Sequence, residues 1–253
     1  RFAFRELRGG LKGFYIFIAC IALGVAAISG VTSVSRAMTD GIQGEGQTIL
    51  GGDIAFRLIH READAVERAY IDSLGPSSRV ATLRAMARKP DGSDQALVEL
   101  KAVDSAYPLY GTFAIDGGGT LGEKLTAGPD GLPGALADAS LLARLGIAVG
   151  DSLSLGRSTV RITGVIASEP DKLSEGLEFG PRLLLSDSAL PATGLVQPGS
   201  LVNWSYRVRL DPGTSDEATR ARMEEARVKF PDAGWRIQSR ANSAPGLQRN
   251  IER

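Results

Sequence analysis

The chain has 253 residues, 43% of them hydrophobic and 23% charged, so it can bury a sizeable core and is not an intrinsically disordered sequence. Its 29 basic and 29 acidic residues cancel to a formal net charge of zero, which argues against a nucleic-acid-binding protein. A single cysteine, Cys20, rules out an intramolecular disulfide, and a single histidine, His60, offers no cysteine–histidine set for zinc. We therefore predict no metal and no cofactor.

The first predicted element is an apolar helix close to the start of the chain. No charged side chain lies between Lys12 and Arg36. At about 1.5 Å per residue, the run 13–35 is long enough to cross the roughly 30 Å hydrocarbon core of a bilayer. Small residues in the run allow a second helix to pack closely. The residues predicted to span the membrane include Gly13, Phe17, Leu23, Gly24, Ile28, Gly30 and Val34.

The flanking charge predicts the orientation of this helix. Residues 1–12 hold four basic residues and one acidic residue, and the positive-inside rule places such a segment in the cytoplasm. The predicted cytoplasmic anchor consists of Arg1, Arg5, Arg8 and Lys12. A cleaved signal peptide and a buried core helix are the alternatives. A signal peptide, however, has a shorter apolar region that ends at an A-x-A-like site.

Two similar units follow, one early and one late in the chain. In the first, alternation predicts a strand at 54–58, and "READAVERAYIDSLGP" predicts a helix that ends at Gly75-Pro76. The predicted core face of this helix is Ala63, Val66, Tyr70 and Leu74. The strands "SRVATLRAMARK" and "QALVELKAV" come next, joined by a turn at "PDGSD". Within the second of them, one face is Ala96, Val98, Leu100 and Ala102.

The late unit has the same order of elements. "WSYRVRL" and "WRIQSR" predict strands on either side of a helix in "TSDEATRARMEEARVKF", where Thr214 and Glu217 have capping-box spacing. The predicted core face of this helix is Thr219, Met223, Ala226 and Phe230. Two strand–helix–strand units usually make one split α+β layer with its helices on one face.

The middle of the chain, residues 111–198, is rich in glycine and short strands. "DSLSLG", "TVRITGVI" and "RLLLS" predict strands, and the helix expected at Ala139–Leu145 ends at Gly146. We predict a mostly β subdomain inserted into the α+β layer.

No stretch predicts catalysis. "GGGTLGEKL" satisfies G-x-G-x-x-G but lacks the Lys-Ser/Thr of a P-loop and a long following helix, so we expect a loop. "EPDKLSEGLEFGPR", residues 169–182, is too irregular for an EF-hand and is interpreted as a solvated loop or as a contact for a substrate or partner. The predicted contact residues in it are Glu175, Phe179 and Arg182.

Several stretches carry a family likeness. They are "RELRGGLKGFYIFIACIALGVAAISGV", "ILGGDIAF", "LVELKAVDSAYPLYG", "LLARLGIAVGDSLSL", "RITGVIASEPDK" and "FGPRLLLS". Together they resemble the permease subunits of the MacB/FtsX/LolC superfamily of ABC transporters, and within it the YbbP-type, lysophospholipase-L1-associated permeases.

This resemblance implies an α+β fold in which an N-terminal transmembrane helix precedes a periplasmic, porter-like split βαβ layer with an inserted mostly β, sabre-like subdomain. The implied segments are cytoplasmic residues 1–12, transmembrane 13–35, porter-like 36–110 and 199–240, sabre-like 111–198, and 241–253 returning toward the membrane. We expect an N-terminal part of a longer protein, with a second transmembrane helix after Arg253.

The resemblance also implies a function. The chain would be a non-enzymatic permease fragment in a bacterial inner membrane, coupling ATP hydrolysis to periplasmic conformational change and extracting hydrophobic or lipid-like molecules. Implied partners are a cytoplasmic ABC ATPase subunit, a periplasmic lipase or esterase, membrane lipid, and a second permease in a dimer or pseudo-dimer. The alternatives are the extracytoplasmic sensor domain of a membrane receptor and an anchored periplasmic enzyme, which the lone histidine disfavours.

Overall fold

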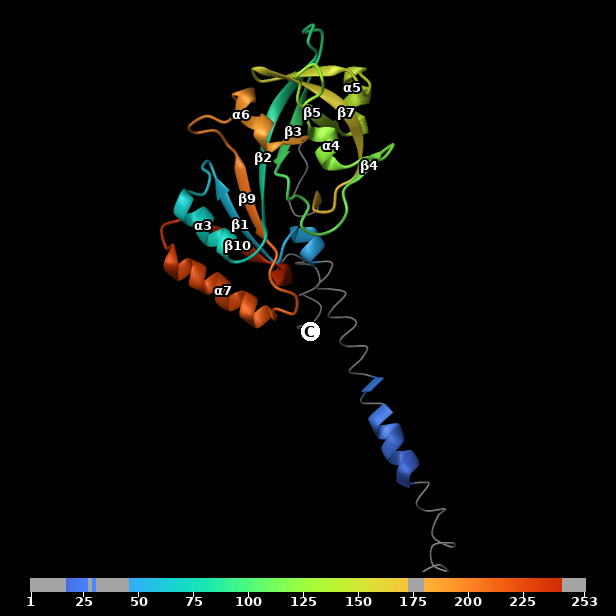
Figure 1. Cartoon of the computed structure of the whole chain (residues 1–253), viewed down its shortest axis with the longest axis vertical. Helices are drawn as coiled ribbons and strands as arrows, with labels where there is room; N and C mark the ends of the chain where they lie inside the picture. Colours follow the sequence, from blue (N-terminus) through green and yellow to red (C-terminus); the bar gives the residue numbers. More distant parts are fainter. Residues whose placement is uncertain (1–16, 27–28, 31–45, 173–179, 243–253) are drawn as a thin grey trace, which may run out of the picture. The chain divides into compact units, whose positions relative to one another are not determined.

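The computed structural model describes residues 17–26, 29–30, 46–172 and 180–242, and the chain divides into two compact units, residues 1–45 and 46–253 (Figure 1). In the first unit, residues 17–26 and 29–30 are helical and exposed. Among the residues that the structure describes, no helix combines the length and the apolar character that crossing a bilayer requires.

The predicted membrane-spanning residues divide accordingly. Phe17, Leu23, Gly24 and Gly30 lie in the helical segments. The others lie outside the described residues: Gly13, Ile28 and Val34, and the cytoplasmic residues Arg1, Arg5, Arg8 and Lys12. The transmembrane helix therefore stays a prediction.

The second unit is an α+β domain, as predicted. Its strands are β1 Ile54–Ile59, β2 Ser77–Arg88, β3 Gln95–Val103, β4 Ala114–Asp116, β5 Gly134–Ala137, β6 Ser152–Leu155, β7 Ser158–Ser168, β8 Arg182–Ser186, β9 Asn203–Val208 and β10 Arg236–Ser239. Its helices are residues 46–50, α3 Ala65–Ser73, α4 Leu121–Leu125, α5 Ala139–Leu145, α6 Leu190–Thr193 and α7 Asp216–Lys229, with 3-10 turns η2 Asp187–Ala189 and η3 Arg240–Asn242.

The described strands form one ten-stranded sheet whose first part has the order β10–β1–β9–β2. β1 pairs antiparallel with β10 and β9, and β9 pairs antiparallel with β2. The units β1–α3–β2 and β9–α7–β10 therefore interlock, which is the predicted split βαβ layer. Both helices pack on one face of this layer. The ring centroids of Tyr70 in α3 and Phe230, which follows α7, are 5.1 Å apart, and both rings contact Trp235.

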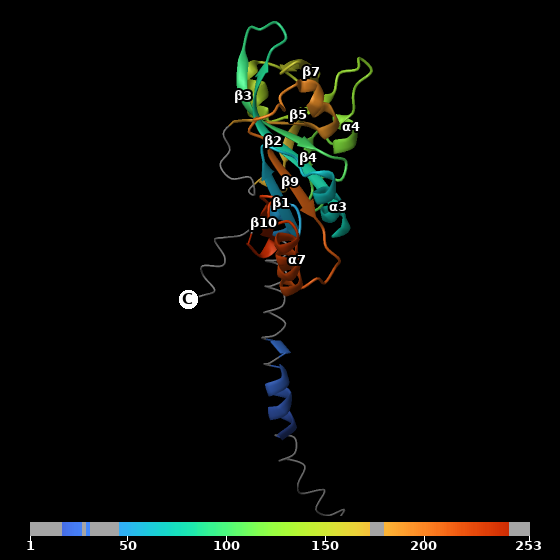
Figure 2. The same cartoon turned by 90° about the vertical axis from the view of Figure 1, so that its left-hand side faces the viewer.

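The remaining strands close on themselves. β3 pairs with β8, β8 with β5, β5 with β7, and β7 with β6, and β6 then pairs back to β2 at Ala87 and Arg88. With the β2–β3 pair, these six strands form a closed ring, which leaves few free edges. Figures 1 and 2 show β1, β10 and α7 at one end of the unit and β5, β7 and α4 at the other, with β2 reaching between them. The boundaries of a sabre-like subdomain at 111–198 stay a prediction.

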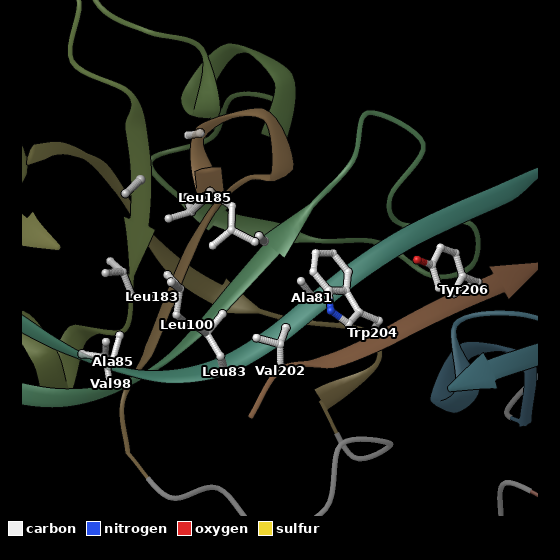
Figure 3. Close-up of a cluster of buried hydrophobic side chains, with 14 of the residues drawn as sticks. Ala81, Leu83, Ala85, Val98, Leu100, Leu183, Leu185, Val202, Trp204 and Tyr206 are labelled. Atoms are coloured by element: carbon white, nitrogen blue, oxygen red, sulfur yellow. The ribbon is translucent and has the colours of Figure 1, made fainter. Parts of the chain in front are cut away.

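One continuous hydrophobic core runs from the helix-covered layer into the ring. Figure 3 shows Trp204 of β9 at Ala81 of β2 and Val202 beside Leu83, and the same cluster of buried side chains continues through β3 and β8. The predicted face of β3 is confirmed, since all four of its residues are fully buried: Ala96, Val98, Leu100 and Ala102. β2 belongs to both parts of the sheet, and the core follows it from one part into the other.

The predicted faces of the two long helices had different outcomes. The face of α7 is confirmed, and its N-cap is Ser215, one residue after the predicted Thr214. The face predicted for α3 was partly wrong, because Val66 is 69% exposed and Ile71 is fully buried instead. The side chain of Glu67 lies on the buried face, where it completes a capping box with Asp64 and pairs with Arg61.

The elements predicted in the middle of the chain also differ in outcome. α5 is confirmed with its predicted bounds, and Gly146 ends it in the left-handed conformation at φ 60°. "GGGTLGEKL", expected to be only a loop, contains the short helix α4. Its signal is the capping box of Thr120 and Glu123.

Candidate functional site

Three of the stretches that carry the family likeness meet in one buried polar region. They are "ILGGD" at 49–53, "YPLYG" at 107–111 and "EPD" at 169–171, which lie far apart in the sequence. Two groups of charged and hydroxyl side chains fill this region. We call them the Asp53 cluster (Gln47, Asp53, Tyr110 and Arg240) and the Lys101 cluster (Lys101, Tyr107, Glu169, Asp171, Arg182 and Arg207).

The Asp53 carboxylate is fully buried and fully hydrogen-bonded. Its Oδ1 accepts from Gln47 Nε2 at 2.8 Å and from Arg240 Nη1 at 2.6 Å. Its Oδ2 accepts from Tyr110 Oη at 2.6 Å and from the Leu210 backbone N–H at 2.8 Å. One side chain therefore joins the helix at 46–50, the loop after β3, the end of β9 and the turn η3.

Hydrogen bonding decides the ionisation of Asp53. Burial alone would raise the pKa of the carboxyl, but the donors Tyr110, Gln47, Leu210 N–H and Arg240 together lower it below its ordinary value of 3.8. The pKa of Tyr110 is raised, because burial and the adjacent Asp53 carboxylate both disfavour the phenolate. The cluster is thus a fixed anion surrounded by donors.

The glycines before Asp53 explain how the backbone reaches this position. Gly51 has φ +72° and donates to Thr48 O, and Gly52 donates to Gln47 O, which ends the short helix. A Cβ added to Gly51 would lie 2.9 Å from Arg207 Nη1. "GGD" therefore lets the backbone pass directly against a side chain of the Lys101 cluster.

The Lys101 cluster is an almost completely buried set of opposite charges. Lys101 Nζ pairs with Glu169 and donates to Asp171 Oδ2 at 2.9 Å, and Arg207 pairs with Asp171. Tyr107 Oη donates to Asp171 Oδ1 at 2.5 Å. Arg182 Nε reaches Glu169 Oε2 at 3.1 Å and connects β8 to the same network.

Buried charges are tolerated only when they are paired, and this cluster meets that condition. Burial would raise the pKa of the Asp171 carboxyl, but the charges of Arg207 and Lys101 lower it well below its usual range. Burial, together with the nearby carboxylates of Asp171 and Glu169, raises the pKa of Tyr107 far above its usual range. Removal of one partner would leave an uncompensated charge in the interior.

A single glycine brings the three stretches into contact. Gly111 has φ +77°, and a Cβ added there would lie 2.5 Å from Pro170 Cβ and 2.9 Å from Thr48 Cγ2. The same loop supplies Tyr107 to one cluster and Tyr110 to the other. The helix at 46–50, the loop after β3 and the segment after β7 therefore touch one another with no room for another methyl group.

The structure describes only the two ends of the loop 169–182. Glu175 and Phe179 lie outside the described residues. Arg182, predicted as a contact for a partner or substrate, is only 2% exposed and pairs with Glu169, so its guanidinium is not on the surface. Glu169 and Asp171 are buried as well, where a solvated loop was one of the two expectations, because three cations converge on them.

The single histidine takes no part in this region. His60 is exposed, and its Nδ1 lies 3.3 Å from Ser200 O. Within the part of the chain that the structure describes, no group of three or more His, Cys, Asp or Glu side chains could hold a metal ion.

Comparison with known proteins gives a consistent result. A family model described as the MacB-like periplasmic core domain matches residues 15–226. The chain is 30% identical over 210 residues to the uncharacterized ABC transporter permease YbbP of Escherichia coli K12. That match covers 82% of this chain but 24% of the relative, so the chain spans about a quarter of the protein it resembles.

One solved structure supports the fold, and a second shows only a weaker likeness. The periplasmic region of MacB from Actinobacillus actinomycetemcomitans matches with a TM-score of 0.50 and 11% identity, over 81% of this chain and 95% of that one. The extracellular domain of the noncanonic ABC-type transporter YknZ from Gram-positive bacteria matches with a TM-score of 0.46 and 13% identity, over 74% of this chain and 98% of that one.

Proposed function

The chain belongs to the MacB-like periplasmic core domain family, and from that premise we propose that it is part of a permease subunit that transmits motion rather than catalysing a reaction. In this proposal, residues 13–35 cross the inner membrane of a bacterium, residues 1–12 lie in the cytoplasm, and the α+β unit lies in the periplasm. A separate cytoplasmic ABC ATPase subunit supplies the energy.

One observation carries the proposal: the hydrogen bonds of the Asp53 cluster. The described part of the α+β unit begins with the helix at 46–50, and Asp53 ties that helix to the segment after β9 and to η3. Gly51 of the same segment lies against Arg207 of the Lys101 cluster, and Gly111 lies between Thr48 of this segment and Pro170. A displacement of residues 46–53 is therefore opposed by buried charged hydrogen bonds and close contacts, which favours a movement of the whole domain over local bending.

The second cluster extends this coupling along the sheet. Lys101 and Arg207 lie on β3 and β9, while Glu169 and Asp171 follow β7 and Arg182 begins β8. The cluster thus joins the helix-covered layer to the ring of strands. We propose that ATP-driven movement of the membrane helix tilts both parts together.

The finer points of the proposal concern cargo and partners. The cargo is a hydrophobic or lipid-like molecule extracted from the membrane, and it is passed to a periplasmic lipase or esterase. Permease subunits work as a dimer, or as a pseudo-dimer within a longer chain. These points rest on the family likeness.

The test uses the full-length permease and its ATPase partner in proteoliposomes. ATP hydrolysis and ATP-dependent transfer of a fluorescent lysolipid to an acceptor are measured for the native protein, for Arg240→Gln and for the matched surface variant Arg220→Gln. We expect Arg240→Gln to hydrolyse ATP and to lose most of its transfer, while Arg220→Gln behaves as native. Equal transfer by all three proteins would contradict the proposal, and a sensor domain would then be the better interpretation.

A further inference from the structure

The face of the sheet opposite α3 and α7 carries a small group of uncharged polar side chains. On β9, Trp204 and Tyr206 point into the hydrophobic core, so the alternating residues Asn203 and Ser205 point to the other face. Asn203 is paired in register with Thr82 of β2, which therefore lies on the same face. We call Thr82, Asn203 and Ser205 the polar row.

The side chains of the polar row make no hydrogen bond within the described part of the chain. Ser205 is only 9% exposed, and its buried Oγ has no hydrogen-bond partner among the described residues. Nearly all buried polar groups in native proteins are hydrogen-bonded, because an unpaired one is costly, so such an exception points to a bound molecule or a function. Thr82 and Asn203 place further donors and acceptors beside this hydroxyl.

The polar row lines a pocket of about 680 Å³, which is within the size range of small-molecule sites. Charged side chains line the pocket as well. Three of them have ion-pair partners: Arg61 with Glu67, Arg207 with Asp171, and Glu99 with Arg182. Arg57 also has an interaction partner within the chain. The remaining two, Asp232 and Arg236, are exposed and opposite in charge, so the described lining does not favour an ionic ligand.

The position of the polar row excludes one mode of binding. β9 lies between β1 and β2 and pairs with both of them. Its backbone groups are therefore used within the sheet, and an extended peptide cannot add to it as a further strand. Recognition at this face depends on side chains.

We propose that the pocket binds a neutral, polyhydroxylated molecule of the sugar class. Hydroxyl and amide side chains both donate to and accept from ligand hydroxyl groups, so the polar row suits such a molecule. The carboxylate of Asp232 can accept from two adjacent hydroxyl groups, and the guanidinium of Arg236 can donate to two. Ile59, which is 57% exposed, lines the same pocket and offers an apolar contact to the C–H face of a sugar ring. The bound hydroxyl groups give Ser205 Oγ the partner that it lacks.

The site requires only the folded sheet, so its test is separate from that of the ATP-coupled role. The 253-residue chain is held in nanodiscs of zwitterionic lipid, and empty nanodiscs give the background. Saturation-transfer NMR titrations measure the binding of three neutral disaccharides (maltose, lactose and N,N′-diacetylchitobiose) and of the neutral peptide acetyl-trialanine amide. The variants are Ser205→Ala, Asn203→Ala at an exposed position, and Ser154→Ala on β6, outside the pocket, as the matched control.

We expect at least one disaccharide to bind saturably to the native chain and to Ser154→Ala. Its affinity should be about fivefold lower for Ser205→Ala and for Asn203→Ala, because each variant loses one hydrogen bond to the ligand. Since Ser205 Oγ has no partner among the described residues, Ser205→Ala should keep the native melting temperature.

Four results would overturn the proposal. The first is that no disaccharide binds saturably, and the second is that either pocket variant binds as the native chain does. The third is that the peptide binds as tightly as the tightest disaccharide, because the pocket would then recognise amide groups. The fourth is a lower melting temperature of Ser205→Ala, because its hydroxyl would then have a partner in the folded protein.

Discussion

Arg240 Nη1 donates to Asp53 Oδ1 over 2.6 Å, although the two residues are 187 positions apart in the chain. Asp53 stands at the start of β1, and Arg240 follows the last strand, so this ion pair closes the described α+β unit. Arg240 also reaches Asp216 and the carbonyl of Thr214, which ties the start of α7 to the same point. The beginning and the end of the domain are therefore held by one buried guanidinium.

The first prediction concerns the charge on Asp53. The variant Asp53→Asn keeps the shape but removes the buried carboxylate that pairs with Arg240, and we expect the free energy of unfolding at pH 7 to fall by about 3 kcal/mol. Urea unfolding followed by circular dichroism measures the difference. The exposed variant Asp211→Asn is the control and should change stability by less than about 0.5 kcal/mol.

The same variant predicts a pH dependence. Because the pKa of Asp53 in the folded state lies below its ordinary value of 3.8, the stabilisation is complete above that value and is lost as the pH falls through the folded pKa. The stability difference between the native chain and Asp53→Asn should therefore be constant from pH 5 to pH 7 and shrink as the pH falls below about 4. A difference that grows on acidification would show that the carboxyl is protonated in the folded protein.

The second prediction tests the buried charge balance around Lys101. Lys101→Met should lower the free energy of unfolding by about 3–5 kcal/mol, because Glu169 and Asp171 each lose a buried cationic partner. Adding Glu169→Gln removes a carboxylate that Lys101 neutralises, and the double variant should regain part of that loss. A double-mutant cycle by chemical unfolding measures the coupling. Simple additivity of the two losses would mean that Lys101 and Glu169 do not act as a pair.

The third prediction tests the contact at Gly111. Gly111→Ala adds a methyl group at φ +77°, where it meets Pro170 and Thr48. Gly213 also has a positive φ, of +83°, but an added Cβ would meet nothing within 4 Å, so Gly213→Ala measures the backbone strain alone. We expect Gly213→Ala to cost about 1 kcal/mol and Gly111→Ala at least about 2 kcal/mol more, measured by thermal unfolding. Equal losses of stability in the two variants would mean that a methyl group at Gly111 meets no neighbouring atoms.

The fourth prediction concerns the face of α3. Ile71→Ala should destabilise the protein by about 2–5 kcal/mol because it opens a cavity in the main core, whereas Val66→Ala should have an effect of less than about 0.5 kcal/mol. The two variants remove side chains of similar size from the same helix. Comparable losses from both variants would mean that Val66 is buried, as the sequence predicted.

The strand pattern and the long helices could be predicted from the sequence because their periodicity is local. The fully buried row on β3 and the helix face ending at Phe230 each follow one spacing along the chain. The buried face of α3 was harder to predict. It includes Glu67, which pairs with Arg61, and a charged residue on the buried face interrupts the apolar pattern that identifies such a face. The cap of α7 moved by one residue because Thr214 and Ser215 are both good N-cap residues.

The Lys101 cluster could not be predicted from the sequence. Lys101 alternates with buried apolar residues on β3, and that pattern alone predicts an exposed lysine on an open face. It is buried because Tyr107, Glu169 and Asp171 converge on it from segments that only the tertiary fold brings together. The two acidic residues of "EPD" could be noticed in the sequence, but their burial could not be predicted. No nearby residue in the sequence identifies the cations that neutralise them.

The most direct test of the proposed coupling follows domain movement in the assembled transporter. Spin labels at Ser93, in the β2–β3 turn, and at Val228, which is 75% exposed on α7, report the distance between the two ends of the α+β unit. In the proposed dimer they also report the distances to the second copy. Electron–electron resonance is measured with and without a non-hydrolysable ATP analogue, for the native permease and for Arg240→Gln. We expect the nucleotide to shift the inter-subunit distances in the native protein and not in Arg240→Gln. The same shift in both proteins would contradict it, because the junction at Asp53 would then not carry the motion.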